Sequence, residues 1–260
     1  MRTAVTERLG IATPIVQAPM GGGPGTVELA AAASNAGALG SLAGGYLTAD
    51  DLRVHLQALR TATDNPFAVN IFVPERIRVD PTTVASVQDV LEPYRVELGL
   101  PARTEPPPVQ DAFAAQIDVL LDAPSPVVSF TFGLPPADVA SRLHDAGCIL
   151  IATVTTVREA VAAVDAGMDL VCAQGSEAGA HRGTFLDDPS EAVIGTVALV
   201  PQVCDAVTVP VIAAGGIMDG RGVAAVLALG AGAAQLGTAF LRCPEAGTPA
   251  AHRRALMSAR

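Results

Sequence analysis

The sequence predicts a single α/β domain, a TIM (β/α)8 barrel with an insertion subdomain after the third strand, and three observations lead to this prediction. The chain has 260 residues, a length that suits one barrel. Half of the residues are hydrophobic but only 3% are aromatic, so alanine, valine, leucine and isoleucine must build the core, as in parallel sheets covered by helices. Finally, eight short apolar runs alternate with helical patterns.

The first three strand-and-helix units precede residue 74. Gly21-Gly22-Gly23 follows the first apolar run, and Thr26 then caps a helix that extends to residue 35. Thr48 caps the next helix, from about residue 49 to residue 61. Asn70 is a polar residue inside the third apolar run and needs a hydrogen-bond partner there. The three strands are expected at residues 15–20, 38–43 and 67–73.

A proline-rich stretch, residues 74–126, interrupts this alternation. It holds nine prolines and most of the longer charged segments of the chain. We predict two helices in it, at residues 82–94 and 109–121, joined by a proline-rich loop. Residues 74–126 are therefore expected to form an insertion or small subdomain within one domain that spans residues 1–260.

Regular alternation resumes after the insertion. Because the strands read as continuous apolar runs, a closed parallel barrel is favoured over an open doubly wound sheet. A Rossmann fold loses further support because no G-x-G-x-x-G motif lies between a strand and a helix. The remaining strands are expected at residues 127–132, 149–154, 169–173, 209–214 and 233–236, and the helices at residues 135–146, 156–166, 190–204 and 220–229.

The charged residues exclude several classes of function. The formal net charge is −10 and the sequence contains no basic run, which argues against nucleic acid or an anionic membrane surface as a partner. All 16 basic residues are arginine. Enzymes that need a lysine Schiff base, including all pyridoxal phosphate enzymes, are therefore excluded. The sequence leaves homo-oligomer formation open.

Cysteine usage and the first residues predict a cytoplasmic protein. The cysteines are widely spaced and are expected to be reduced, small apolar residues. Charged residues precede any apolar run at the N-terminus, so no secretory signal is predicted. Two uncharged stretches, residues 29–49 and 222–241, reach the roughly 20 residues of a membrane span, but their glycines and polar residues indicate helix, turn and buried strand in succession. The four cysteines are Cys148, Cys172, Cys204 and Cys243.

The most informative stretch for function is Cys172–Gly183, which follows the sixth predicted strand. Gly175, Gly179 and Gly183 are spaced four apart and keep the backbone open. His181 lies between the last two of them, and an imidazole can exchange a proton near neutral pH. We therefore predict that His181 is the catalytic base, although a loop that needs only positive φ angles would also contain glycines. The other histidines, His55, His144 and His252, do not follow a strand.

Two glycine-containing turns predict a phosphate site. Gly215-Gly216 ends the seventh strand and Gly237-Thr238 ends the eighth, the two positions where such barrels commonly bind phosphate. Glycines let peptide N–H groups approach an anion, and the Thr238 hydroxyl can donate as well. The alternative is that these glycines only permit tight turns. Since the chain has no lysine and no predicted metal cluster, a phosphorylated cofactor would supply the difficult chemistry.

Six segments of the chain carry a resemblance to a known family. Together they resemble the nitronate monooxygenases, formerly called 2-nitropropane dioxygenases, in order from residue 15 to about residue 256. The segments are 17–23 (QAPMGGG), 70–74 (NIFVP), 129–133 (SFTFG), 173–183 (AQGSEAGAHRG), 212–222 (IAAGGIMDGRG) and 235–241 (QLGTAFL).

This resemblance implies an FMN-dependent barrel that oxidises alkyl nitronates, such as propionate 3-nitronate, with molecular oxygen to a carbonyl compound and nitrite. It places His181 on the catalytic histidine of the family, where it would remove the Cα proton of a neutral nitroalkane or position a nitronate. Together with the glycine turns, it gives the cofactor-binding residues as Met20, Gly21, Asn70, Gln174, Gly179, Gly215, Gly216, Gln235, Leu236, Gly237 and Thr238.

The sequence departs from the family pattern in two places. Ala180 replaces the second glycine before the histidine, and a positive φ there would be strained. The family pattern continues after the last helix with a further arm, whereas this sequence ends at Arg260. Two alternatives stay open: an FMN- and NADH-dependent enoyl-acyl carrier protein reductase, which shares the barrel and a similar histidine loop, and a non-catalytic flavin-binding barrel.

Overall fold

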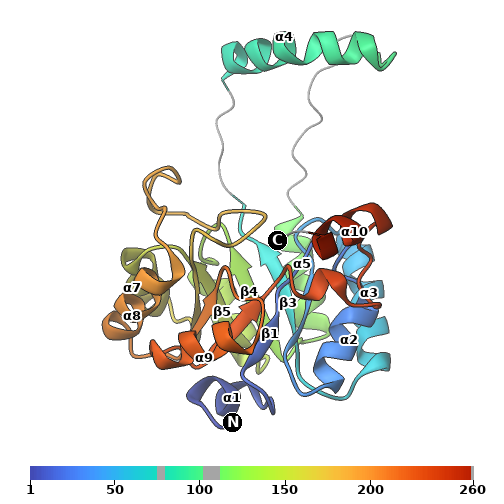
Figure 1. Cartoon of the computed structure of the whole chain (residues 1–260). Helices are drawn as coiled ribbons and strands as arrows, with labels where there is room; N and C mark the ends of the chain where they lie inside the picture. Colours follow the sequence, from blue (N-terminus) through green and yellow to red (C-terminus); the bar gives the residue numbers. More distant parts are fainter. Residues whose placement is uncertain (75–79, 102–111, 259–260) are drawn as a thin grey trace. The chain divides into compact units, whose positions relative to one another are not determined.

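Eight parallel strands form one sheet in the computed structural model, which describes residues 1–74, 80–101 and 112–258 (Figure 1). The strand order is β1-β8-β7-β6-β5-β4-β3-β2, and a parallel bridge between Val16 and Leu39 joins the two end strands. The predicted (β/α)8 barrel is confirmed. The strands are β1 (Ile15–Gln17), β2 (Gly40–Ala43), β3 (Phe67–Phe72), β4 (Val127–Thr131), β5 (Ile149–Val154), β6 (Leu170–Gln174), β7 (Val211–Ala214) and β8 (Ala233–Leu236).

Several helices of the barrel unit begin at a capping threonine. Thr26, Thr48 and Thr156 each accept a hydrogen bond from a backbone N–H in the first turn of α2, α3 and α7. The helices of the barrel unit are α1 (Ala4–Leu9), α2 (Val27–Asn35), α3 (Ala49–Ala62), α5 (Phe113–Asp122), α6 (Ala137–Asp145), α7 (Val157–Asp165), α8 (Thr196–Ala206), α9 (Gly220–Ala228), the short 3₁₀ helix η1 (Phe240–Arg242) and α10 (Ala250–Ser258).

Several helices differ from the sequence prediction, among them α4 (Pro81–Glu97), which ends at Glu97 and not at residue 94, and α10, which was not predicted. Helix α8 begins at Thr196 and not near Ser190, because residues 188–191 form a local turn in which Asp188 accepts from the backbone N–H of Ser190. Helix α1 was not predicted, although Thr3 and Thr6 form a reciprocal capping box at its start. A six-residue helix is too short for its apolar periodicity to be visible in the sequence.

The described residues divide into two units. The first comprises Met1–Val73 and Ala112–Arg260, and includes the barrel; the second is Pro74–Asp111 and contains α4 (Pro81–Glu97). Asp80 caps α4 by accepting from the backbone N–H groups of Thr82 and Thr83. The extent of the predicted insertion, residues 74–126, stays a prediction, because residues 75–79 and 102–111, including the start of the predicted helix 109–121, lie outside the described residues.

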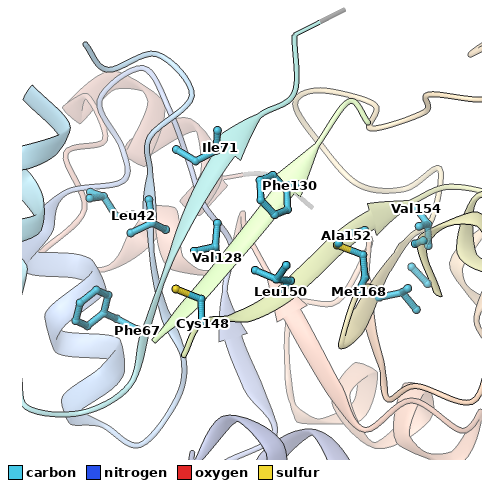
Figure 2. Close-up of a cluster of buried hydrophobic side chains, with 14 of the residues drawn as sticks. Leu42, Phe67, Ile71, Val128, Phe130, Cys148, Leu150, Ala152, Val154 and Met168 are labelled. Carbon is cyan, nitrogen blue, oxygen red and sulfur yellow. The ribbon is translucent and has the colours of Figure 1, made fainter. Parts of the chain in front are cut away.

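Apolar side chains that point outward from the strands form the main core with the surrounding helices. On β4, Val128 and Phe130 are fully buried in this outer layer, and on β5 Leu150 and Ala152 are buried beside them (Figure 2). Side chains alternate between the two faces of a strand, so the residues between these point toward the barrel axis. Each strand therefore contributes every second residue to the packing of the helices.

The inward side chains are apolar near the amino ends of the strands. Ala68, Val127, Leu170 and Ile212 belong to a second buried cluster, which also includes Val5 of helix α1. Val5 is fully buried and packs so closely on Gly232 that a Cβ there would lie 2.6 Å from its Cγ2. Helix α1 therefore closes the amino end of the barrel.

The two stretches considered above as membrane spans fold as helix, turn and strand. Residues 29–49 contain most of α2 followed by β2, and residues 222–241 contain most of α9 followed by β8. Within the described part of the chain, every helix is too short or too polar to cross a bilayer.

A charged cluster ties α1 to the amino end of the barrel, and it generates a prediction. Asp169, which precedes β6, accepts hydrogen bonds from Arg8 (2.6 Å), His144 (3.0 Å) and the backbone N–H of Leu150 (2.8 Å). Burial alone would raise the pKa of the Asp169 carboxyl, but these three donors lower it below the usual value of 3.8. Its ionised form is thus more stable in the folded chain than in the unfolded chain.

We expect Asp169→Asn to lower the free energy of unfolding by about 1–3 kcal/mol at pH 6, the usual cost of breaking a partly buried charged hydrogen bond. Because the folded-state pKa is lowered, this stabilisation is complete above pH 3.8 and is lost as the pH falls below it. Urea unfolding of both proteins at several pH values measures the difference. The exposed Asp64→Asn serves as the control, and a difference that persists unchanged at low pH would contradict the assignment.

Candidate active site at the carboxyl ends of the strands

Polar side chains replace the apolar ones on the inner face near the carboxyl ends of the strands. They line a cavity on the barrel axis with an empty volume of about 310 Å³, open solvent at its mouth included. Cys172 also lines it, but burial raises the pKa of its thiol to about 12, so the thiol stays protonated and is not a nucleophile. The polar residues that line the cavity are Ser41, Asn70, Ser129, Thr153 and Gln235.

A more open depression lies at the opposite end of the barrel. Of the residues that line it, only Thr3 and Cys204 have polar side chains. In an α/β barrel that end serves stability, whereas the carboxyl ends of the strands carry the chemistry. We therefore place the candidate active site at the carboxyl ends of the strands. The reason is the polar lining of the cavity there, and not the relative size of the two depressions.

His181 lies among three aromatic rings that stand at or just after the carboxyl ends of three consecutive strands. Its ring centroid is 6.0 Å from Tyr46, 5.9 Å from Phe72 and 5.5 Å from Phe132. The Nε2 atom of His181 is 2.9 Å from the hydroxyl oxygen of Tyr46. The chain has only nine phenylalanine and tyrosine residues and no tryptophan, so three of the nine surround one imidazole.

The backbone is strained at two places next to this imidazole. Ala180 has a φ of 63° and Phe132 has a φ of 70°, and they are the only non-glycine residues with a positive φ among those described. A left-handed conformation costs an L-residue roughly 1–2 kcal/mol. The strain expected at Ala180 from the sequence is thus present, and both strained residues adjoin or contact His181, as is common at functional sites.

Gln174 at the end of β6 holds the backbone on both sides of Arg182. Its Nε2 donates to the carbonyl of His181 at 2.9 Å, and its Oε1 accepts from the N–H of Gly183 at 2.8 Å. Arg182 in turn donates to the backbone carbonyl of Gln174 at 2.6 Å and to that of Ala192. The Gln174 side chain, which was expected to contact a cofactor, therefore holds the backbone of the loop that carries His181.

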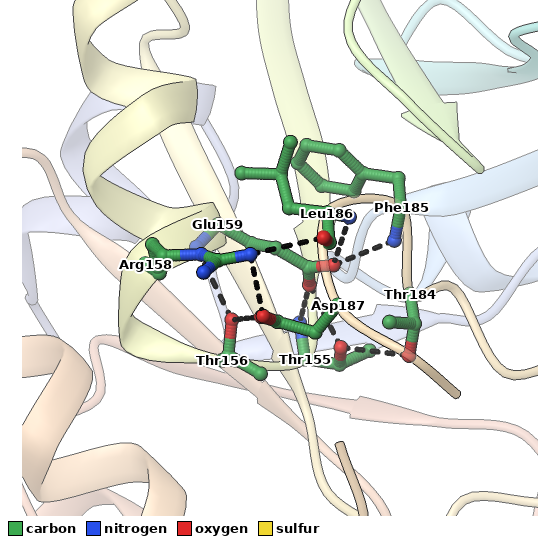
Figure 3. Close-up of polar contacts among 8 residues, drawn as sticks. All are labelled: Thr155, Thr156, Arg158, Glu159, Thr184, Phe185, Leu186 and Asp187. Carbon is green, nitrogen blue, oxygen red and sulfur yellow. Dashed lines mark hydrogen bonds and ion pairs between the residues drawn. The ribbon is translucent and has the colours of Figure 1, made fainter. Parts of the chain in front are cut away.

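The first turn of α7 anchors the far end of the same loop (Figure 3). Glu159 is completely buried, and its carboxylate accepts from the N–H groups of Phe185 (2.6 Å) and Leu186 (3.0 Å). The other carboxylate oxygen accepts from the N–H and hydroxyl of Thr155. Beside it, Arg158 pairs with Asp187 at 2.6 Å. A buried carboxylate with four donors thus joins the loop to a helix N-terminus.

The near end of the loop is anchored on α8. Glu177 accepts from the backbone N–H of Thr196, the first residue of α8, at 2.8 Å, and from its hydroxyl at 2.8 Å. Burial would raise the pKa of the Glu177 carboxyl, but these hydrogen bonds, assisted by the charge of Arg182, lower it below its usual value. The partial positive charge at the N-terminus of α8 also stabilises the Glu177 carboxylate.

The two glycine turns present free backbone donors. Gly215 and Gly216 have φ angles of 120° and 69°, so a side chain at either would be strained. Within the described ranges, the N–H groups of Gly216, Gly237 and Thr238 have no hydrogen-bond acceptor. Such donors at the ends of β7 and β8 fit a phosphate group, which is the observation that supports a phosphorylated cofactor.

The other predicted site residues fall into two groups. Asn70 is 3% exposed and donates to Ser129 and Thr131, and Gln235 lines the cavity, so both belong to the inner wall. Met20, Gly21 and Gly179 lie in the loops after β1 and β6. Leu236 packs into the outer core, so that only its backbone can face a ligand.

Sequence reasoning missed the residues that contact His181. The signal that could have revealed them is their position, because the chain is poor in aromatic residues and three of these lie at or just after the carboxyl end of a predicted strand. They are Tyr46, Phe72 and Phe132. Of the described residues, no three His, Cys, Asp or Glu side chains are close enough together to hold a metal ion.

Comparison with known protein families gives one family over almost the whole chain. The model of the family described as "Nitronate monooxygenase" matches residues 2–260. A protein of Bacillus subtilis (strain 168) named "Probable nitronate monooxygenase" is 43% identical over 257 residues, which cover 97% of this chain and 72% of the relative. A Staphylococcus aureus (strain Newman) protein of the same name is 41% identical and is matched over 73% of its length.

Two solved structures resemble this chain to different degrees. The nitroalkane oxidase of Streptomyces ansochromogenes is 45% identical with a TM-score of 0.90, and the match covers 97% of this chain and 72% of that one. FabK from Thermotoga maritima is 34% identical with a TM-score of 0.77, and the match covers 100% of this chain and 68% of that one. The fold is more similar to the first structure than to the second.

The buried carboxylate of Glu159 generates a prediction about the loop. Glu159→Gln replaces one of the two acceptor oxygens by an NH2 group, so two of the four donors lose their acceptor. We expect the free energy of unfolding to fall by about 1–3 kcal/mol and the amides of Phe185 and Leu186 to exchange faster with deuterium. Glu191→Gln, on an exposed side chain of the same loop, is the control. Unchanged exchange at residues 185 and 186 would contradict the anchoring role.

Proposed function

Because this chain belongs to the nitronate monooxygenase family, a family of flavin-dependent oxidoreductases, we propose that it oxidises alkyl nitronates with molecular oxygen to a carbonyl compound and nitrite. Propionate 3-nitronate is one member of the proposed substrate class. The observation that carries the proposal is His181, held by its loop among aromatic side chains at the carboxyl ends of the strands. We expect the enzyme to act in the cytoplasm, in keeping with its four free cysteines.

We propose FMN as the cofactor. Gly215, Gly216, Gly237 and Thr238 would hold its phosphate through backbone N–H groups, and Asn70, Gln174 and Gln235, with the backbone of Leu236, would contact the remainder. Met20, Gly21 and Gly179 would approach the ring from the loops. When bound, the flavin supplies the electron acceptance and the reactivity toward oxygen that amino-acid side chains lack.

The protein residues prepare the substrate. His181 accepts the Cα proton when a neutral nitroalkane binds; the C–H bond breaks, its electron pair forms the C=N bond, and negative charge collects on the nitro oxygens. A substrate that arrives as the nitronate needs no base, and His181 then positions it. The rings of Phe72 and Phe132 pack edge-on against the imidazole, with ring centroids 5.9 and 5.5 Å from it.

The resemblance to FabK keeps a second candidate in view, an FMN- and NADH-dependent enoyl-acyl carrier protein reductase. The greater similarity to the nitroalkane oxidase, at 45% identity and a TM-score of 0.90, favours the first candidate. A non-catalytic flavin-binding barrel is the remaining alternative.

Purification with FMN and exposure to substrate under nitrogen separate these three functions. We expect ethyl nitronate to bleach the visible absorbance of the bound flavin without oxygen, and NADH to leave it unchanged. Bleaching by NADH alone would support the reductase, and bound flavin that responds to neither compound would support a non-catalytic barrel. Readmission of oxygen should restore the absorbance and release nitrite.

His181→Asn tests the assignment of the base. We expect kcat/KM for neutral nitroethane to fall by roughly 10²–10⁴, the usual contribution of a general base, while pre-formed ethyl nitronate retains much of its rate. Nitrite release measures both. His252→Asn, at an exposed position of α10, controls for loss of a histidine, and equal losses on the two substrates would remove the base assignment.

A further inference from the structure

We propose that Tyr46 is a positioning residue for His181, one that fixes the orientation of the imidazole and determines which ring nitrogen can accept the substrate proton. The proposal rests on the proposed function of His181 as a base. Its starting point is the 2.9 Å contact between the Tyr46 hydroxyl and His181 Nε2, which joins residues 135 positions apart in the sequence.

Hydrogen bonds from helix α5 hold the backbone of the loop that carries Tyr46. Gln116 of α5 is only 2% exposed, and its Nε2 donates to the backbone carbonyls of Gly44 at 2.9 Å and Leu47 at 2.6 Å. Leu47 also donates its N–H to the carbonyl of Gly44, and Gly44 donates its own to Asn70. Although the Tyr46 side chain is 61% exposed, the backbone on both sides of it is therefore held in place.

Two glycines make room for the aromatic rings. A Cβ at Gly21 would lie 2.7 Å from Cδ2 of Tyr46, and a Cβ at Gly45 would overlap the ring of Phe72. Tyr46 in turn packs edge-on against Phe72, with ring centroids 5.2 Å apart. The backbone of Gly21 and the ring of Phe72 thus hold the Tyr46 ring in the position where its hydroxyl contacts the imidazole of His181.

The hydrogen bond to Nε2 has a chemical consequence. A neutral imidazole carries one N–H and one lone pair, and the partner of one nitrogen determines the state of the other. A phenol hydroxyl both donates and accepts, so Tyr46 can pair with Nε2 in either tautomer. In the tautomer with the proton on Nε2, the Tyr46 oxygen accepts that N–H, and the lone pair on Nδ1 is left to take up the substrate proton. In hydrolytic triads a carboxylate performs the corresponding task.

Tyr46→Phe removes the hydroxyl and keeps the ring on Gly21 and Phe72. We expect kcat/KM for neutral nitroethane to fall about 10–100-fold, the range found when the hydrogen-bond partner of a metal-ligating histidine is lost, and the rate with pre-formed ethyl nitronate to change less than about twofold. Tyr94→Phe is a matched control: Tyr94 is the other tyrosine of the chain, 60% exposed against 61% for Tyr46. Equal losses on the two substrates, or no loss, would overturn the proposal.

A spectroscopic measurement tests the same contact without turnover. The chain has four histidines, so the imidazole nitrogen signals in a ¹⁵N-labelled FMN-bound sample can be assigned to His181 by comparison with His181→Asn. We expect Tyr46→Phe to change the tautomer shifts of His181, and Tyr94→Phe to leave them as they are. Identical His181 shifts in both variants and the parent would overturn the role of Tyr46. This result does not depend on activity, so a chain inactive on every nitronate would refute the proposed function separately.

Discussion

The alternation of side chains along parallel strands is the constraint on which the rest of this structure depends. Each strand must present every second residue to the helices and every other one to the barrel axis. The outward positions are mostly apolar, as Val128, Phe130 and Leu150 illustrate. The inward positions change from apolar at the amino ends to polar at the carboxyl ends, with Val127 followed by Ser129 on one strand. The polarity needed for a site is thus confined to one end.

The loop after β6 converts this polar end into a defined site. Glu177 fastens one end of it to α8, Glu159 fastens the other to α7, and the amide of Gln174 spans the backbone between them. These contacts replace water around buried polar groups, so breaking any of them leaves an unpaired donor or acceptor. They also explain how Ala180 is held at a φ of 63°, because the anchors on both sides determine the path of the chain.

Much of the fold was predictable from the sequence, because strand runs, glycine turns and capping threonines are local signals. The barrel and the positions of Thr26, Thr48 and the glycine turns follow from them. The contacts of the site were less accessible. Asn70 needed a partner, but that the partner is Ser129 depends on the register of β3 and β4. Glu159 lies in a helical pattern that would equally suit an exposed glutamate. Tyr46 and His181 meet only once the barrel closes.

Helix α1 closes the amino end of the barrel, because Val5 and Leu9 pack against the inward side chains there. The barrel axis is therefore closed at its amino end. Any ligand of the inner polar side chains therefore has to approach from the carboxyl ends of the strands, where His181 lies.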